Sequence, residues 1–231
     1  MSTYFCSDLH GEYQLLCKLL DKIGFCKTDT FYILGDIIDK GSDSLRLAEL
    51  IRRFENMKAI LGNHEYYFLQ YYESCMCEYE GGDENRVLQK LQNYFPLDTF
   101  RLTWDLVDYI ESLPYYIEGA DFICVHAGLQ LDKEKRVIPM QKQQYNYILF
   151  DRNFKEENVI PIDSKSVLFG HTPCNYQNGT GKFIKTPRAN TDINSKNFKD
   201  YAKIQLDTGS YLTGMVGCLR KEDMHEFYVK R

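Results

Sequence analysis

Short apolar runs that each end in a polar, glycine-containing turn are the feature that most limits how this 231-residue chain can fold. The runs have the length and composition of buried strands. Four of the five histidines follow such runs directly, a placement that scattered surface histidines would not show. The polar turns are Ser7-Asp8-Leu9-His10-Gly11, Gly35-Asp36-Ile37-Ile38-Asp39-Lys40-Gly41, Gly62-Asn63-His64-Glu65, Val125-His126-Ala127-Gly128, Gly170-His171-Thr172 and Leu206-Asp207-Thr208-Gly209.

The first third of the chain alternates strand-like runs with stretches of helical periodicity. Leu15, Leu16 and Leu19, for example, recur at the spacing of one helix face. Such alternation predicts parallel, right-handed βαβ units. Because the carboxyl ends of parallel strands line the crevice where α/β proteins bind ligands, we expect the polar turns to converge. The expected strands span residues 4–6, 31–34 and 58–61, and the expected helices span residues 12–23 and 45–54.

The remainder is expected to complete one α/β domain over residues 1–231, with a mixed sheet or two facing sheets. Residues 65–113 predict a mainly helical insert with breaks at Gly81-Gly82 and Pro96. The polar stretch 172–200 predicts a long loop with room for a small hairpin. Further strands are expected at 121–125, 166–169, 202–206, 215–219 and 225–229, and short connections predict that the last three form an antiparallel hairpin or meander.

The composition favours a packed, cytoplasmic protein. Hydrophobic residues make up 44% of the chain, and the formal net charge of −5 gives no electrostatic reason to expect nucleic acid or a membrane surface as partner. No apolar run reaches the roughly 18 residues of a membrane span, and the N-terminal residues lack the pattern of a signal peptide. Cys6, Cys124 and Cys218 lie inside apolar runs, which favours reduced thiols over disulfides.

Histidine, carboxylate and amide side chains that meet at one point suit Mn, Fe, Zn or Co. Two groups that share one carboxylate can hold two ions about 3.5–4 Å apart. Asp36 is the expected shared ligand because it follows the central strand. Two divalent ions outweigh two carboxylates and a bridging hydroxide, so the site would favour a phosphate dianion. One group is Asp8, His10 and Asp36, and the other is Asn63, His126 and His171.

Taken in order, the turns resemble the signature of the calcineurin-like metallophosphoesterases. Within that superfamily the chain most resembles the phosphoprotein phosphatases, the Ser/Thr protein phosphatases with bacterial and phage members. The similarity runs from Ser7 to about Gly217 and rests on six motifs in the family's order. It implies an α/β fold, an αββα sandwich of two mixed β-sheets flanked by helices. It also implies two divalent metal ions, most often manganese, with iron or zinc as the other options.

The resemblance assigns roles to individual residues. His64 would be the general acid that protonates the leaving oxygen, oriented and kept charged by Asp39. Glu65 is expected to start a helix or support a ligand, and Asp207 to form a turn beneath the site. The implied ligands are Asp8, His10 and Asp36 for the first ion, and Asp36, Asn63, His126 and His171 for the second.

The phosphate-binding residues depart from the family at one position. The family's second motif ends in Asp-Arg-Gly, whereas this chain has Asp39-Lys40-Gly41. Lysine keeps the charge but gives up the planar fork of arginine, so we expect weaker and less oriented phosphate binding. Arg152, after the apolar Leu149-Phe150, resembles the second phosphate-binding arginine of the bacterial members. Asn63 is also expected to lie against the phosphate.

The leading expectation is a metal-dependent phosphomonoester hydrolase that acts on phosphoserine or phosphothreonine, with a metal-activated hydroxide as nucleophile. The first alternative is a dinucleoside polyphosphate (Ap4A-type) hydrolase, because a close relative group shares every motif named above. The other alternative is a non-catalytic phosphate-binding scaffold, which predicts damaged ligand positions, and the six are intact. No nucleic-acid or membrane partner is expected, and the oligomeric state is left open.

Overall fold

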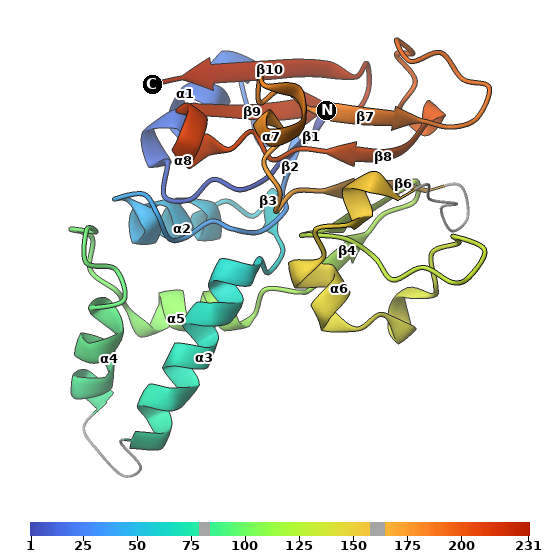
Figure 1. Ribbon diagram of the computed structural model, residues 1–231. Helices are drawn as coiled ribbons and strands as arrows, with labels where there is room; N and C mark the ends of the chain where they lie inside the picture. Colours follow the sequence, from blue (N-terminus) through green and yellow to red (C-terminus); the bar gives the residue numbers. More distant parts are fainter. Residues whose placement is uncertain (79–83, 158–164) are drawn as a thin grey trace.

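The computed structural model describes residues 1–78, 84–157 and 165–231 and contains two five-stranded sheets. Both sheets combine parallel and antiparallel pairs. Helices flank the sheets, and two of them, α3 and α4, project away from the rest of the molecule (Figure 1). The expected α/β architecture of two mixed sheets flanked by helices is therefore confirmed.

The first sheet is formed by the two ends of the chain. The parallel neighbours β1, β2 and β3 are joined by α1 (Tyr13–Ile23) and α2 (Ser44–Arg53), as the alternating pattern predicted. A hairpin of β9 and β10 adds to β1 in the antiparallel direction. In spatial order the strands are β10 (His225–Lys230), β9 (Met215–Arg220), β1 (Thr3–Cys6), β2 (Thr30–Ile33) and β3 (Met57–Ala59).

The second sheet corrects one expectation. Strand β8 does not join β9 and β10 in a meander, because it pairs with β6 in parallel and with β7 in the antiparallel direction. All five residues of β8 are buried, so the strand needs the interior position that the second sheet offers. In spatial order this sheet holds β4 (Tyr116–Glu118), β5 (Phe122–Val125), β6 (Ser166–Phe169), β8 (Tyr201–Gln205) and β7 (Ile184–Pro187).

The stretch expected to be a helical insert holds α3 (Asn63–Glu78), α4 (Glu84–Gln92) and α5 (Trp104–Glu111). Pro96 lies between α4 and α5, while the expected break at Gly81-Gly82 lies outside the described residues. Among the described helices, none combines the length and apolar character that a membrane span requires. The short helices within the described ranges are η1 (Met140–Lys142), α6 (Tyr145–Phe150), η2 (Phe154–Glu156), α7 (Asn175–Asn178), η4 (Phe198–Asp200) and α8 (Ser210–Thr213).

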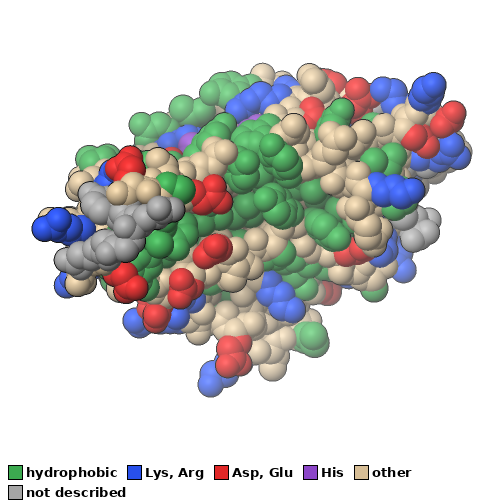
Figure 2. Space-filling model, turned by 90° about the horizontal axis from the view of Figure 1, so that it is seen from below, with side chains coloured by type: hydrophobic (Ala, Val, Ile, Leu, Met, Phe, Trp, Pro, Cys, Tyr) green, Lys and Arg blue, Asp and Glu red, His purple; other side chains and the backbone are tan. Residues whose placement is uncertain are grey.

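Aromatic side chains join α3 to α6. Figure 2 views the molecule from below, the side on which α3 and α6 lie in Figure 1. Hydrophobic side chains gather across the middle of this face. The ring of Tyr66 lies 5.7 Å from that of Tyr145 and 5.8 Å from that of Phe150. Tyr66, near the start of α3, is therefore a packing residue between the two helices.

Aromatic packing also holds the two sheets together. The fully buried Phe5 of β1 places its ring 5.1 Å from Phe122 of β5 and 6.1 Å from Phe198 of η4. Tyr32, on the neighbouring strand β2, stacks on Phe5 at 5.2 Å and contacts Phe122 at the same distance. The contact between Phe5 and Phe122 fixes the spacing of the sheets directly behind the polar turns.

We predict that Phe5→Ala lowers the free energy of unfolding by about 3–5 kcal/mol, because truncation of a buried Phe loses its transfer free energy and leaves a cavity. Phe5→Leu should cost less, since it fills most of that space. Urea denaturation followed by far-UV circular dichroism measures both. A loss below about 1 kcal/mol for the alanine variant would show that Phe5 does not hold the sheets together.

Candidate metal centre

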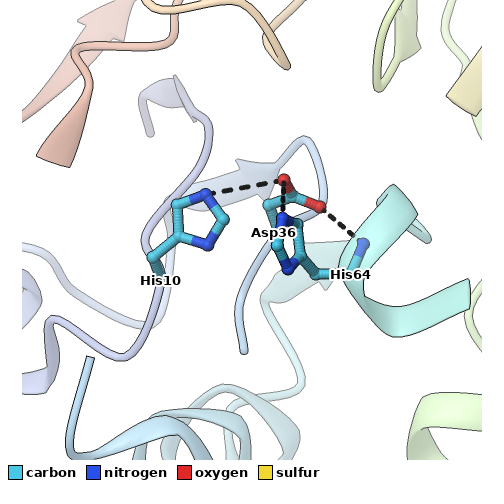
Figure 3. Close-up of side chains that lie close together, drawn as sticks. All are labelled: His10, Asp36 and His64. Atoms are coloured by element: carbon cyan, nitrogen blue, oxygen red, sulfur yellow. Dashed lines mark hydrogen bonds and ion pairs between the residues drawn. The ribbon is translucent and has the colours of Figure 1, made fainter. Parts of the chain in front are cut away.

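Asp36 lies at the centre of the converging turns. It follows β2, is 2% exposed, and places one carboxylate oxygen, Oδ2, 3.5 Å from His10 Nε2. The other oxygen, Oδ1, lies 3.4 Å from His126 Nε2. Figure 3 shows the rings of His10 and His64 next to the Asp36 carboxylate, each joined to it by a dashed line. The carboxylate thus lies between imidazoles from three different loops.

The first group of possible metal ligands is His10, Asp36 and His64, whose ligand atoms all lie within 4.8 Å of one another. His10 Nδ1 lies 3.1 Å from the carbonyl oxygen of Ile38. Because a carbonyl oxygen can only accept, we assign the ring proton to Nδ1, which leaves Nε2 with a free lone pair 3.5 Å from Asp36 Oδ2. Burial, followed by the nearby Lys40 charge, holds the pKa of His10 well below its usual value.

The second group is Asp36, His126 and His171, with ligand atoms again within 4.8 Å of one another. His126 Nδ1 donates to the carbonyl oxygen of Leu34 at 2.8 Å, and Nε2 is the ring nitrogen that faces the site. That nitrogen faces Asn63 Oδ1 at 2.9 Å and His171 Nδ1 at 3.2 Å. His171 Nδ1 in turn lies 2.8 Å from the same amide oxygen.

These donor atoms fit a cation. Ring nitrogens, an amide oxygen and a carboxylate oxygen lie close together here, and each of these atoms can offer a lone pair to a metal ion. Ligand atoms that share an ion at bond lengths of about 2.1 Å lie roughly 3 Å apart, which matches the spacing found here. Burial and the neighbouring His126 lower the pKa of His171 to about 2, so this ring is neutral, the form that binds metals.

Asp8 is placed differently from the other predicted ligands. Among the described residues its carboxylate belongs to neither group. It accepts hydrogen bonds from the backbone N–H of His171 at 3.0 Å and from the hydroxyl of Ser7. Gly170 permits this contact, because a Cβ there would lie 2.1 Å from the Asp8 carboxylate. Asp8 therefore lies directly beside the site, and its role as a ligand stays a prediction.

His64 and Asp39 form the expected pair. His64 Nδ1 donates to Asp39 Oδ2 at 2.8 Å, and Nε2 lies 3.9 Å from Asp36 Oδ2. Burial lowers the pKa of His64, but the hydrogen bond to Asp39 and the charge of Asp36 outweigh it, so the pKa is raised. Tyr94, which the sequence did not single out, also reaches Asp39, with its hydroxyl 3.5 Å from the carboxylate. The raised pKa favours the charged form that a general acid needs, a role that stays a prediction.

Lys40 and Arg152 line the same cavity, which has a volume of about 220 Å³ and reaches His10 and His171. Lys40 Nζ donates to His10 Nε2 at 2.8 Å. Two cationic side chains thus lie at the edge of the ligand groups, where a phosphate would meet them. Asp207, which also lines the cavity, accepts a hydrogen bond from the backbone N–H of Gly209 at 2.7 Å, the turn that the sequence predicted.

Glu65 has a larger structural role than the sequence indicated. It lies in the first turn of α3, as expected, and is fully buried. Its carboxylate accepts four backbone N–H groups, from Asp36 at 2.9 Å, Ile37 at 2.8 Å, Ile38 at 3.0 Å and Gly62 at 2.8 Å. A residue after β3 therefore fixes the loop after β2. A side chain that accepts hydrogen bonds from backbone N–H groups of another loop leaves no pattern in the sequence. The only sequence signal for Glu65 is its position beside Asn63 and His64.

The backbone is strained where the polar turns meet. Residues other than glycine rarely adopt a positive φ, and each such residue costs about 1–3 kcal/mol. Nine non-glycine residues among the described ones have a positive φ. Six of them belong to the polar turns, namely Asp8, His10, Asp36, Asp39, Lys40 and His171. Such clustering is typical of functional sites, where surrounding contacts hold an unfavourable conformation.

Comparisons with known proteins agree on the family. The family described as calcineurin-like phosphoesterase matches residues 1–199. The chain is 31% identical over 140 residues to the symmetrical bis(5'-nucleosyl)-tetraphosphatase of Baumannia cicadellinicola subsp. Homalodisca coagulata, which covers 60% of this chain and 41% of that protein. It is 29% identical over 173 residues to the enzyme of that name from Buchnera aphidicola subsp. Acyrthosiphon pisum, covering 69% and 58%. The chain thus spans about half the length of the curated relatives it matches.

Solved structures share the fold. The crystal structure of a candidate diadenosine tetraphosphatase has a TM-score of 0.66 and 18% identity, with 99% of this chain and 93% of that chain covered. A protein serine/threonine phosphatase from Saccharomyces cerevisiae has a TM-score of 0.56 and 13% identity, with 100% and 80% covered. At such low identities the likeness establishes the architecture alone.

We predict that Glu65→Ala lowers the free energy of unfolding by at least ~3 kcal/mol, because each buried N–H left without an acceptor costs about 1–3 kcal/mol. Glu65→Gln should lose less, since the amide oxygen still accepts. Glu73→Ala, at an exposed position of the same helix, is the matched control. If urea denaturation gave the same midpoint for Glu65→Ala and Glu73→Ala, the carboxylate would not be fixing the loop.

Metal stoichiometry tests the shared position of Asp36. We predict two divalent ions per chain after loading with manganese and gel filtration, as counted by mass spectrometry of the elements. Asp36→Asn should lose both ions, because the variant lacks the carboxylate that both groups share, whereas His126→Ala should lose one. His225→Ala, at the exposed fifth histidine, is the control. Retention of both ions by Asp36→Asn would contradict a shared site.

Proposed function

Because this chain belongs to the calcineurin-like phosphoesterase family, we propose that it is a metal-dependent hydrolase that cleaves a phosphoanhydride bond in dinucleoside tetraphosphates. The observation that carries the proposal is the buried Asp36 carboxylate, 3.5 Å from His10 on one side and 3.4 Å from His126 on the other. This arrangement suits two ions that share one ligand, as in other two-metal phosphoesterases.

The substrate class is inferred from the relatives. Those from Baumannia and Buchnera are both named symmetrical bis(5'-nucleosyl)-tetraphosphatase. The expectation of a phosphoprotein substrate lacks such support, since the yeast serine/threonine phosphatase shares the fold at only 13% identity. The alternative that the sequence left open is therefore favoured over the leading expectation. The intact ligand positions argue against a non-catalytic scaffold.

The chain's own residues would bind and orient the substrate. Two divalent ions, when bound, would polarise the phosphoryl group and lower the pKa of a water, which is the chemistry this family draws from its metals. Lys40 and Arg152 would bind the anionic oxygens of the phosphate chain from one side of the cavity. His64, held by Asp39 at 2.8 Å, would donate its Nε2 proton to the departing phosphate oxygen.

The reaction balances as a hydrolysis. Water adds to one of the two central phosphorus atoms, and the bridging P–O bond between them breaks. For a symmetrical cleavage the products are two nucleoside diphosphates. Because a phosphate oxygen is a better leaving group than a serine alkoxide, proton donation by His64 contributes less with an anhydride than with a phosphoserine.

We predict that the manganese-loaded protein converts diadenosine tetraphosphate to ADP with a kcat/KM at least 10-fold higher than for a phosphoserine peptide. Chromatographic quantification of ADP, ATP and AMP identifies the bond that breaks. A preference for the phosphopeptide, or ATP with AMP as products, would overturn the proposed substrate or the proposed bond.

His64→Asn should lower kcat on diadenosine tetraphosphate by roughly 10²-fold, the lower end of the range that general acids supply, because the phosphate leaving group needs less help from an acid. KM and bound manganese should stay close to wild type, since His64 is assigned to proton transfer and not to metal binding. His225→Asn is again the control. A loss of manganese in the His64 variant would instead assign His64 to the first ligand group, in which it lies with His10 and Asp36.

A further inference from the structure

The cavity that reaches the ligand groups also has an aromatic wall. Lys40, Arg152 and His171 line it together with Tyr176, Tyr211 and Leu212. The last three are 67%, 49% and 54% exposed, which is high for side chains so apolar. A site for inorganic phosphate, or for a small phosphate ester, needs the cations but not the rings. The exposed rings therefore suit a substrate that carries an apolar group in addition to its phosphates.

The two tyrosines lie on short helices next to turns that carry residues of the site. Tyr176 lies on α7, after the turn that carries His171, and Tyr211 lies on α8, after Asp207. The backbone N–H of Cys174 donates to the carbonyl oxygen of Asp207 at 2.8 Å, which joins the two loops. The backbone segments that precede the two tyrosines are thus tied to each other.

A second hydrogen bond fixes α8 directly to the turn after β1. The hydroxyl of Ser210 donates to the carbonyl oxygen of Asp8 at 2.6 Å, and both residues are buried. Tyr211 follows Ser210 in the chain, so its Cα is held close to the turn that bears Asp8 and His10. The tyrosine side chains remain exposed while their backbone is held, which suits a surface prepared for a flat, apolar ligand.

We propose that Tyr211 and Tyr176 form the binding face for one nucleobase of the substrate, with the attached phosphates directed towards Lys40 and Arg152. This inference rests on the proposed function for the identity of the substrate. A nucleotide combines an anionic chain with a flat aromatic ring, and the cavity combines cations with aromatic side chains. Stacking of a base on an aromatic side chain is worth about 1–3 kcal/mol.

The same face accounts for selection between substrates. Stacking rewards any purine, because every base has a π-face, so guanine should replace adenine with little loss. A phosphoserine peptide offers no base and would gain from these rings only through a neighbouring apolar side chain. Tyr211 and Tyr176 are therefore specificity-determining residues and take no part in proton transfer.

The test uses Tyr211→Ala, Tyr176→Ala and the double variant, with Tyr147→Ala as the matched control. Tyr147 is an exposed tyrosine of α6 that does not line this cavity. For manganese-loaded proteins, calorimetry gives the affinities of ADP and of inorganic pyrophosphate. We expect the double variant to bind ADP at least 5-fold more weakly and to bind pyrophosphate within 2-fold of wild type. Thermal unfolding should be unchanged, because both side chains are exposed.

Kinetics give an independent readout. The double variant should lose at least 5-fold in kcat/KM on diadenosine tetraphosphate, mainly through KM, and keep its rate on inorganic tripolyphosphate, which has the anhydride bonds but no ring. Equal losses for ADP and pyrophosphate, or no loss for either, would overturn the base-binding face. Loss of phosphopeptide cleavage with unchanged ADP affinity would assign the face to a peptide and overturn it as well.

The two proposals fail separately. If wild type bound ADP through the tyrosines but did not cleave diadenosine tetraphosphate, the base-binding face would stand and the proposed reaction would fall. If wild type cleaved the tetraphosphate and the double variant cleaved it equally well, the reaction would stand and the face would fall. If wild type did not bind ADP at all, the face would be excluded.

Discussion

The hydrogen bonds of Glu65 are the constraint on which the site depends. Two loops leave the neighbouring strands β2 and β3 of the first sheet, and beyond the strand ends their backbone N–H groups no longer have strand partners. The Glu65 carboxylate accepts N–H groups from both loops, including that of Asp36 at 2.9 Å and that of Gly62 at 2.8 Å. Burial strengthens such bonds and makes their loss costly. Four backbone dipoles thereby stabilise this buried carboxylate.

That constraint explains how the strained backbone persists. Asp36 and His10 have φ values of 52° and 44°, a conformation that an isolated chain would rarely adopt. The N–H of His10 donates to the carbonyl oxygen of Asp36 at 2.9 Å, and that of Gly11 donates to Ile37 at 2.8 Å. The loops after β1 and β2 therefore support each other, while Glu65 holds the second of them. Strain at the ligands is offset by hydrogen bonds that do not involve their side chains.

The sequence predicted the parts of this structure that depend on local pattern. Strand ends marked by Asp36, Asn63 and His126 are visible in the alternation of apolar runs and polar turns, and the two mixed sheets followed from the family resemblance. Partners far apart in the chain were not predictable in this way. The pairing of β8 with β6, the four donors to Glu65 and the aromatic wall of the cavity all depend on tertiary packing. A short strand joins the sheet that can bury it, and the residues of the strand alone do not specify which sheet that is.

The two sheets contribute different halves of the centre. His10, Asp36 and Asn63 follow strands of the first sheet, whereas His126 and His171 follow strands of the second. The approaches of Asp36 to His126 at 3.4 Å and of Asn63 to His171 at 2.8 Å therefore both cross the interface between the sheets. Phe5 and Phe122 pack across the same interface. A cation bound to both halves would act as a further contact between the sheets and would stabilise the folded state by mass action. Metal affinity and the packing of the sheets are then coupled, because each is favoured by the spacing that the other requires.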